Sequence, residues 1–250
     1  MEYILILVAG LVAGFINTVA GGGSLITLPI LIFMGLPSAT ANGTNRIALM
    51  AQNISAIANF KRKGFFYPKL VFLLGLPAII GAIIGAKIAV DLPDEIFNKT
   101  LGIVMIFVLI MIVTRPEKKF LKNQEFEELI GKRKIISIIV FFIIGIYGGF
   151  IQAGVGFILI VSLSLITGLS LVKINSIKVG IVAVYTVSAL IIFIVNGNID
   201  WGLGILLAIG NSIGAYLGSD FSVKKGDKYI QAVITIAVIV MAGKLWGLWL

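Results

Sequence analysis

The feature that most constrains this chain is an uncharged run of 43 residues, Tyr3–Asn45, which contains the glycine triplet Gly21–Gly23. The run is too long for one membrane crossing, which needs about 20 residues, and short for two. Glycine triplets interrupt helices, and irregular backbone at membrane depth survives only where protein or a water-filled cavity surrounds it. We therefore predict a hairpin with helical arms at residues 4–19 and 24–34 and the triplet at its tip.

The remainder of the sequence is equally apolar. Its 250 residues are 59% hydrophobic and 12% charged, whereas a soluble domain is about 25% charged. Uncharged runs bounded by charges recur, and most approach the length of a spanning helix. These features predict an all-α polytopic protein of the cell (inner) membrane, in contact with lipid. The net charge of +9 is interpreted as loop lysines that set orientation, and no nucleic-acid partner is expected.

The two halves of the chain resemble each other. Seven residues of the first half recur 133 positions later, including the pairs Gly23/Gly156 and Asn42/Asn175. Each half is predicted to open with a Gly-interrupted helical hairpin and to continue with about three spanning helices, which gives eight to ten membrane segments. The predicted organisation is membrane repeat 1 at residues 1–114, a basic linker at 115–134 and membrane repeat 2 at 135–250.

The distribution of basic residues predicts the orientation. If each long uncharged run is a hairpin that returns to its starting face, 16 of the 20 basic residues lie on one side of the membrane. A single crossing would instead divide them 12 to eight. The positive-inside rule favours the first arrangement. We expect a cytoplasmic linker, both termini outside and two inverted repeats, whose tips meet near the midplane where a substrate site is expected.

The stretch AGFINTVAGGGSLITLPILIFMGLPSATANGTNRIA, which starts at Ala13, resembles the first-repeat signature of the TauE/SafE-type sulfite exporter family. That resemblance implies a secondary permease for small anions, often sulfur-containing ones such as sulfite and organosulfonates. The chain departs from the family pattern at Ser24, where the family has a fourth glycine. It departs again in the second repeat, where Lys178 stands at the position that matches Asn45.

The candidate substrate-binding residues lie at the two tips and in the segments that follow them. Asn42, Thr44 and Asn45 follow the second arm of the first hairpin, where they either line a vestibule or cap a helix that begins near Arg46. A helix that starts after a glycine triplet, with Ser24 as its predicted N-cap, presents free N–H groups that suit an anion. The alternative role of such glycines is close helix packing, which we favour for Gly81 and Gly85. Buried amides either bond a neighbouring helix or contact substrate, and Arg46 and Lys178 either attract an anion or reach the membrane surface. The candidates are Asn17, Gly21, Gly22, Gly23, Ser24, Asn42, Thr44, Asn45, Arg46, Gln52, Gln152, Gly154, Gly156, Asn175 and Lys178.

The composition also bears on the class of activity. The chain has no Cys and no His, and its 11 acidic residues lie at segment ends or in the linker. An intramembrane enzyme needs such groups at depth, so we expect neither enzymatic activity nor a metal or cofactor. The same composition leaves the coupling ion (proton or sodium) unidentified, and homo-oligomerisation stays open. The predicted function is alternating-access anion transport around the paired tips. The alternatives are a non-transporting membrane scaffold or accessory protein and a channel-like facilitator.

Overall fold

The computed structural model describes residues 2–114, 129–230, 232, 233 and 236. Within these ranges the chain forms nine named helices and no strand, which confirms the all-α class. Four of the helices, α4, α7, α9 and α10, are long and apolar enough to cross a membrane. The basic linker predicted at residues 115–134 falls largely on residues outside the described ranges. The helices are α1 (Glu2–Val19), α2 (Ser24–Phe33), α3 (Ser38–Arg62), α4 (Pro68–Val90), α5 (Asp94–Thr114), α7 (Gly131–Phe150), α8 (Val155–Thr167), α9 (Leu171–Val195) and α10 (Trp201–Lys225).

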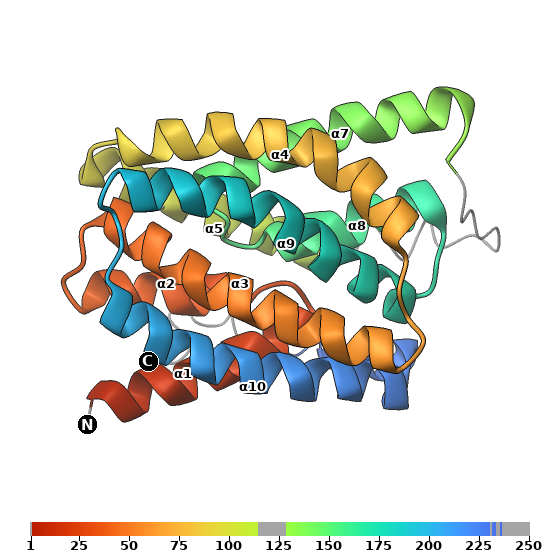
Figure 1. The fold of residues 1–250 in the computed structure, drawn as a ribbon, viewed down its shortest axis with the longest axis horizontal. Helices are drawn as coiled ribbons and strands as arrows, with labels where there is room; N and C mark the ends of the chain where they lie inside the picture. The colour runs from red at the N-terminus through yellow and green to blue at the C-terminus, as the bar shows by residue number, and fades with distance from the viewer. Residues whose placement is uncertain (1, 115–128, 231, 234–235, 237–250) are drawn as a thin grey trace.

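Two helical hairpins open the two halves of the chain. In the first, α1 and α2 are joined by a turn at residues 20–23, in which Gly21 has a left-handed backbone with φ +92°. In the second, α7 and α8 are joined through Gln152 (φ 67°) and Gly154 (φ 71°). The predicted arms and tips are therefore present. Figure 1 shows that α1 and α7 start at opposite ends of the bundle and run toward its middle. The orientation of each half relative to a membrane stays a prediction.

Each hairpin packs against a helix from the other half of the sequence, α1 against α10 and α7 against α4. Glycines make these contacts backbone to backbone. A Cβ on Gly14 would lie 2.2 Å from the carbonyl oxygen of Asn211, and one on Gly81 would lie 2.1 Å from that of Phe142. Small residues at such spacings let membrane helices approach closely. The packing role predicted for Gly81 and Gly85 is confirmed.

These contacts sort the helices into two groups that differ from the sequence repeats. The lower group in Figure 1 contains α1, α2, α3 and α10, and the upper group contains α4, α7, α8 and α9. Each group thus takes its hairpin and third helix from one half of the chain and its fourth helix from the other half. The long helices α3 and α9 meet in the middle and join the groups.

The third helix begins earlier than the sequence suggested. We expected a helix boundary near Arg46, with Asn42, Thr44 and Asn45 in a vestibule or a cap, but α3 starts at Ser38 and contains all four residues. Pro37 precedes the helix with φ −52°, and its fixed φ suits the residue before a helix start. A polar stretch was mistaken for a boundary because it interrupts the apolar run.

The two tips touch each other through their glycines. A Cβ on Gly156 would lie 2.3 Å from Cα of Gly21, and a Cβ on Gly21 would lie 2.3 Å from the carbonyl carbon of Gly156. The atoms that would have to move are backbone atoms on both sides, so no side chain can give way. The sequence prediction that the two tips approach each other is confirmed.

We expect Gly156→Ala to lower the apparent melting temperature of the detergent-purified protein. Overpacking of this kind costs about 1–3 kcal/mol. The matched control is Gly102→Ala in α5, where an added Cβ meets no atom within 4 Å and the helical backbone suits alanine. Equal melting temperatures for the two variants would contradict the contact between the tips.

Candidate functional site

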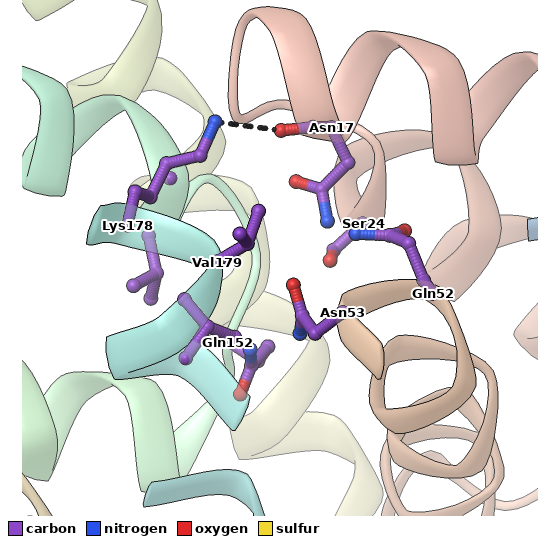
Figure 2. A pocket seen from close by; sticks show the side chains of 10 residues that line it. Asn17, Ser24, Gln52, Asn53, Gln152, Lys178 and Val179 are labelled. Carbon is purple, nitrogen blue, oxygen red and sulfur yellow. Dashed lines mark hydrogen bonds between the residues drawn. The ribbon is translucent and has the colours of Figure 1, made fainter. Parts of the chain in front are cut away.

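A small cavity lies between the two tips, in the middle of the bundle. Figure 2 shows that its polar side chains come from both hairpins and from α3 and α9. The first residues of both short helices, α2 and α8, form part of its wall, so two helix N-termini meet there. The cavity holds about 10 Å³ of space for the centre of a water-sized sphere. Its lining residues are Asn17, Ser24, Gln52, Asn53, Gln152, Val155, Gly156, Lys178, Val179 and Val182.

Lys178 lies on one wall of the cavity and closes the C-terminal end of α1. Its Nζ donates to the carbonyl oxygens of Asn17 and Thr18, both at 2.9 Å, and to Oδ1 of Asn175 at 2.8 Å. Asn175 in turn donates from Nδ2 to the carbonyl oxygen of Val19 at 2.9 Å. Together the two side chains satisfy the last three carbonyl groups of α1, which have no partner within the helix.

Arg46, on α3, caps the C-terminal end of α7 in the second hairpin in the same way. Its guanidinium donates to the carbonyl oxygens of Gly148 and Gly149 and, at 3.0 Å, to Oε1 of Gln152. Asn42, one turn earlier on α3, donates from Nδ2 to the carbonyl oxygen of Phe150 at 2.6 Å. The last three carbonyl groups of α7 are therefore satisfied by a basic residue and an asparagine on α3, as those of α1 are by a matching pair on α9.

Both cations are fully enclosed by protein. Arg46 is 0% exposed and Lys178 is 2% exposed. Among the described residues no carboxylate pairs with Arg46 or Lys178, whereas Lys63, Lys99 and Lys224 do form ion pairs with carboxylates. The partial negative charge at the ends of α1 and α7 offsets part of each positive charge. The middle of the bundle therefore carries two buried positive charges without an acidic counterion from the described part of the chain.

Two amides on α3 offer hydrogen-bond donors that the protein does not use. Nε2 of Gln52 and Nδ2 of Asn53 are buried without an acceptor, and both side chains line the cavity. Oε1 of Gln52 accepts from Nδ2 of Asn211 at 3.3 Å, which directs its NH₂ group away from α10. Buried donors in native proteins normally have a partner, so an unused pair beside a cavity indicates room for an acceptor. This arrangement suits a ligand that accepts hydrogen bonds.

The structure divides the predicted site residues into three sets. Those in the cavity wall are Asn17, Ser24, Gln52, Gln152, Gly156 and Lys178. Those that hold the tips together or close the helix ends are Gly21, Gly22, Gly23, Gly154, Asn42, Arg46 and Asn175. Those with contacts elsewhere are Thr44, which accepts from the N–H of Asp200, and Asn45, which accepts from the hydroxyl of Thr27. Their roles in binding stay predictions.

One expectation about the first tip is wrong. Ser24 is the first residue of α2 and Gly23 is the N-cap, with no side-chain hydrogen bond to the helix. The Ser24 side chain is directed to the cavity (Figure 2). The N-cap position is taken by a glycine because a Cβ there would lie 2.2 Å from the carbonyl oxygen of Ala13. Close contact between α1 and the turn thus decides which residue caps the helix.

The sequence reasoning missed four lining residues, Asn53, Val155, Val179 and Val182. The three valines carry no signal, because an apolar residue in a spanning helix is the expected one. Asn53 was detectable as a second amide in the middle of an apolar segment, yet helical periodicity favoured only one of two neighbouring residues for the inward face. Both face inward because the hairpin tips and α9 surround this part of α3.

The chain is similar along almost its whole length to known membrane proteins. Residues 6–245 match the sequence profile described as "Sulfite exporter TauE/SafE". Curated relatives include "Probable membrane transporter protein ORF9" of Sinorhizobium sp, 26% identical with 95% of this chain and 90% of the relative covered. Another is "Probable membrane transporter protein YfcA" of Escherichia coli (strain K12), 27% identical with 94% and 86% covered. A third, YunE of Bacillus subtilis (strain 168), is 22% identical with 98% and 97% covered. No solved structure matches the chain significantly.

We expect Arg46→Met to destabilise the protein strongly. The substitution leaves the carbonyl groups of Gly148 and Gly149 buried without donors, at a cost of about 1–3 kcal/mol for each unsatisfied group. The measurement is the apparent melting temperature in detergent, with Lys87→Met as the control at an exposed basic residue of α4. If the two variants melt together, Arg46 does not hold the end of α7.

Proposed function

Because this chain belongs to the sulfite exporter TauE/SafE family and is a multi-pass membrane transporter, we propose that it carries a small anion through the cavity between its two hairpin tips. The observation that carries this proposal is the chemistry of the cavity wall. It combines the buried cation Lys178 with unpartnered amide N–H groups of Gln52 and Asn53. A wall of donors and positive charge complements a ligand that accepts hydrogen bonds and carries negative charge.

The charge balance supports an anionic substrate. An unpaired buried charge costs several kcal/mol, and removal of its counterion is strongly unfavourable. Arg46 and Lys178 are partly compensated by helix ends, but the described part of the chain gives them no carboxylate. A bound anion would supply the missing negative charge. The N-termini of α2 and α8, which meet at the cavity, would add the positive ends of two helix dipoles.

The dimensions of the site favour a small substrate. The cavity admits about one water-sized sphere in this conformation, so a bound ion would have to lose its hydration shell or the tips would have to separate. A sulfite or sulfonate group has three oxygens around its sulfur atom, and these can accept hydrogen bonds from several amide N–H groups at once. The family name and this donor set support sulfite or an organosulfonate as the substrate.

The arrangement of helices supports alternating access. In Figure 1 the cavity-forming hairpins belong to different groups of helices, one built around α3 and α10 and the other around α4 and α9. A rocking motion of one group against the other would open the tips first to one face and then to the other. The units that we propose to move are these two groups of helices and not the two sequence repeats. The reason is that α4 of the first repeat packs with the second repeat, and α10 of the second repeat packs with the first.

We expect sulfite or sulfoacetate to raise the apparent melting temperature of the detergent-purified protein, because a ligand that binds only the folded state stabilises it. The same measurement is made with sulfate, thiosulfate, small carboxylates and neutral solutes. Asn53→Leu should abolish this increase. The same variant should melt no lower than the wild type without ligand, because it removes a buried donor that has no partner. Asn196→Leu, at an exposed amide, is the control. Stabilisation by cations or neutral solutes alone would contradict the anion assignment.

We expect the end of the bundle at Lys61 to face the cytoplasm and the turn at Asp91 to face outward, as the positive-inside distribution predicts. The chain has no cysteine, so single cysteines can report on each side. In intact cells, a membrane-impermeant maleimide should label Asp91→Cys and should label Lys61→Cys only after the cells are opened. The reverse pattern would place both termini in the cytoplasm and invert the proposed orientation.

A further inference from the structure

In each half of the chain, a basic residue donates hydrogen bonds to the last carbonyl groups of the first hairpin helix of the other half. The two basic residues differ in type. Arg46 closes α7 and Lys178 closes α1, and the asparagines that assist them, Asn42 and Asn175, occupy matching positions in the two halves. A guanidinium stays protonated in proteins, whereas a lysine ammonium can release its proton. The pair therefore combines one permanent positive charge with one that can be switched off.

We propose that Lys178 is the proton-binding residue that couples anion transport to the movement of a proton. This inference rests on the proposed function and adds the identity of the coupling ion. Lys178 is buried and lines the cavity, so its charge acts directly on whatever occupies the space between the tips. Protonation of Lys178 favours a bound anion, and by linkage a bound anion favours protonation.

The hydrogen bonds of Lys178 connect its protonation to the position of the first tip. An ammonium has three N–H donors, and all three are used, on the carbonyl oxygens of Asn17 and Thr18 and on Oδ1 of Asn175. When the ammonium gives its proton to water, the neutral amine keeps two N–H donors for three acceptors. One hydrogen bond is lost, together with the attraction between the ammonium and the negative end of α1. Proton release thus loosens the contact between α9 and the tip of the first hairpin.

The surroundings of Lys178 contain no other group suited to this role. On the described helices that contact α9, the charged or titratable side chains in the middle of the bundle are the buried Arg46 on α3 and the partly buried Tyr147 on α7. The helix α9 itself adds the buried Tyr185 and, near its start, the partly buried Lys173. Arg46 and Tyr185 are joined through Gln152, which accepts from the first and donates to the second at 3.2 Å. The remaining charged or titratable groups of α1, α3, α4, α7 and α10 are exposed or lie near helix ends, and α8 has none. They are Glu2 at the start of α1, Tyr3, Lys61, Arg62, Lys69, Lys87, Lys132, Arg133, Lys134, Tyr216, Asp220, Lys224 and Lys225.

The transport cycle that follows accounts for every proton that Lys178 binds and releases. On one face of the membrane, neutral Lys178 takes a proton from water and the cavity takes an anion. The two groups of helices then rearrange with both ions bound. On the other face the anion leaves and the ammonium returns its proton to water. The two groups of helices then return with the cavity empty and Lys178 neutral. Each cycle therefore moves one proton and one anion in the same direction, and no group of the protein is chemically altered.

The test compares uptake of radiolabelled sulfoacetate and sulfite by proteoliposomes under two conditions, counterflow without a gradient and uptake driven by an inward proton gradient. Sulfoacetate is the decisive probe because both of its acidic groups stay ionised at neutral pH. The substrate itself then carries no proton, so any proton that moves with it is bound by the protein. For the wild type we expect counterflow, and an increase of several-fold in initial uptake when the gradient is imposed. Lys178→Arg, which keeps the positive charge, should lose the stimulation by the gradient, measured as the ratio of gradient-driven uptake to the counterflow of the same variant. Lys87→Arg, at an exposed lysine, should keep both.

A second measurement does not depend on a folded Lys178→Arg variant. Sulfoacetate binding to the wild type should tighten as the pH falls, by up to about tenfold for each pH unit wherever binding takes up one proton. It should also draw protons from a weakly buffered solution. Counterflow without any gradient stimulation, stimulation by sodium in place of protons, or full stimulation in Lys178→Arg would overturn the inference and leave anion transport intact. Absence of counterflow with both probes would overturn the proposed function and this inference together.

Discussion

The structure depends on two sets of hydrogen bonds between the halves of the chain, which we call the crossed contacts. In each set, a basic residue of one half caps the C-terminal end of the first hairpin helix of the other half. Arg46 on α3 holds the last carbonyl groups of α7, and Lys178 on α9 holds those of α1. A helix that stops inside a membrane exposes carbonyl groups that lipid cannot satisfy. These contacts therefore permit two helices to end in the middle of the bundle, and the space beside their ends becomes the cavity.

The crossed contacts also explain why a glycine-rich tip is compatible with the fold. Gly21 and Gly156 meet backbone to backbone, and the surrounding helices α3 and α9 exclude lipid from the turns. The same closeness brings the N-termini of α2 and α8 to one point. Ends that are costly alone become a ligand-binding environment when they converge, since the free N–H groups and positive dipole ends then face a shared space.

The exchange of α4 and α10 between the halves of the chain defines the two groups of helices in the bundle. Because glycine contacts join α1 to α10 and α7 to α4, each group of helices includes residues from both halves of the chain. The halves cannot separate as independent domains. In the alternating-access motion that we propose, the two groups would move at the surface where α3 meets α9 and where the tips touch. That surface contains the cavity and both buried cations.

The sequence by itself determined the membrane class, the helical composition, the two hairpins and six of the ten cavity residues, because apolar runs, glycine triplets and buried amides leave direct traces in the order of residues. It misplaced the start of α3, since Asn42–Arg46 look like a boundary when their partners are unknown. Only the tertiary structure decided that Arg46 and Lys178 face helix ends, that Asn53 and three valines line the cavity, and that α4 and α10 change places. Each of these depends on contacts between residues more than 60 positions apart, which no local pattern records.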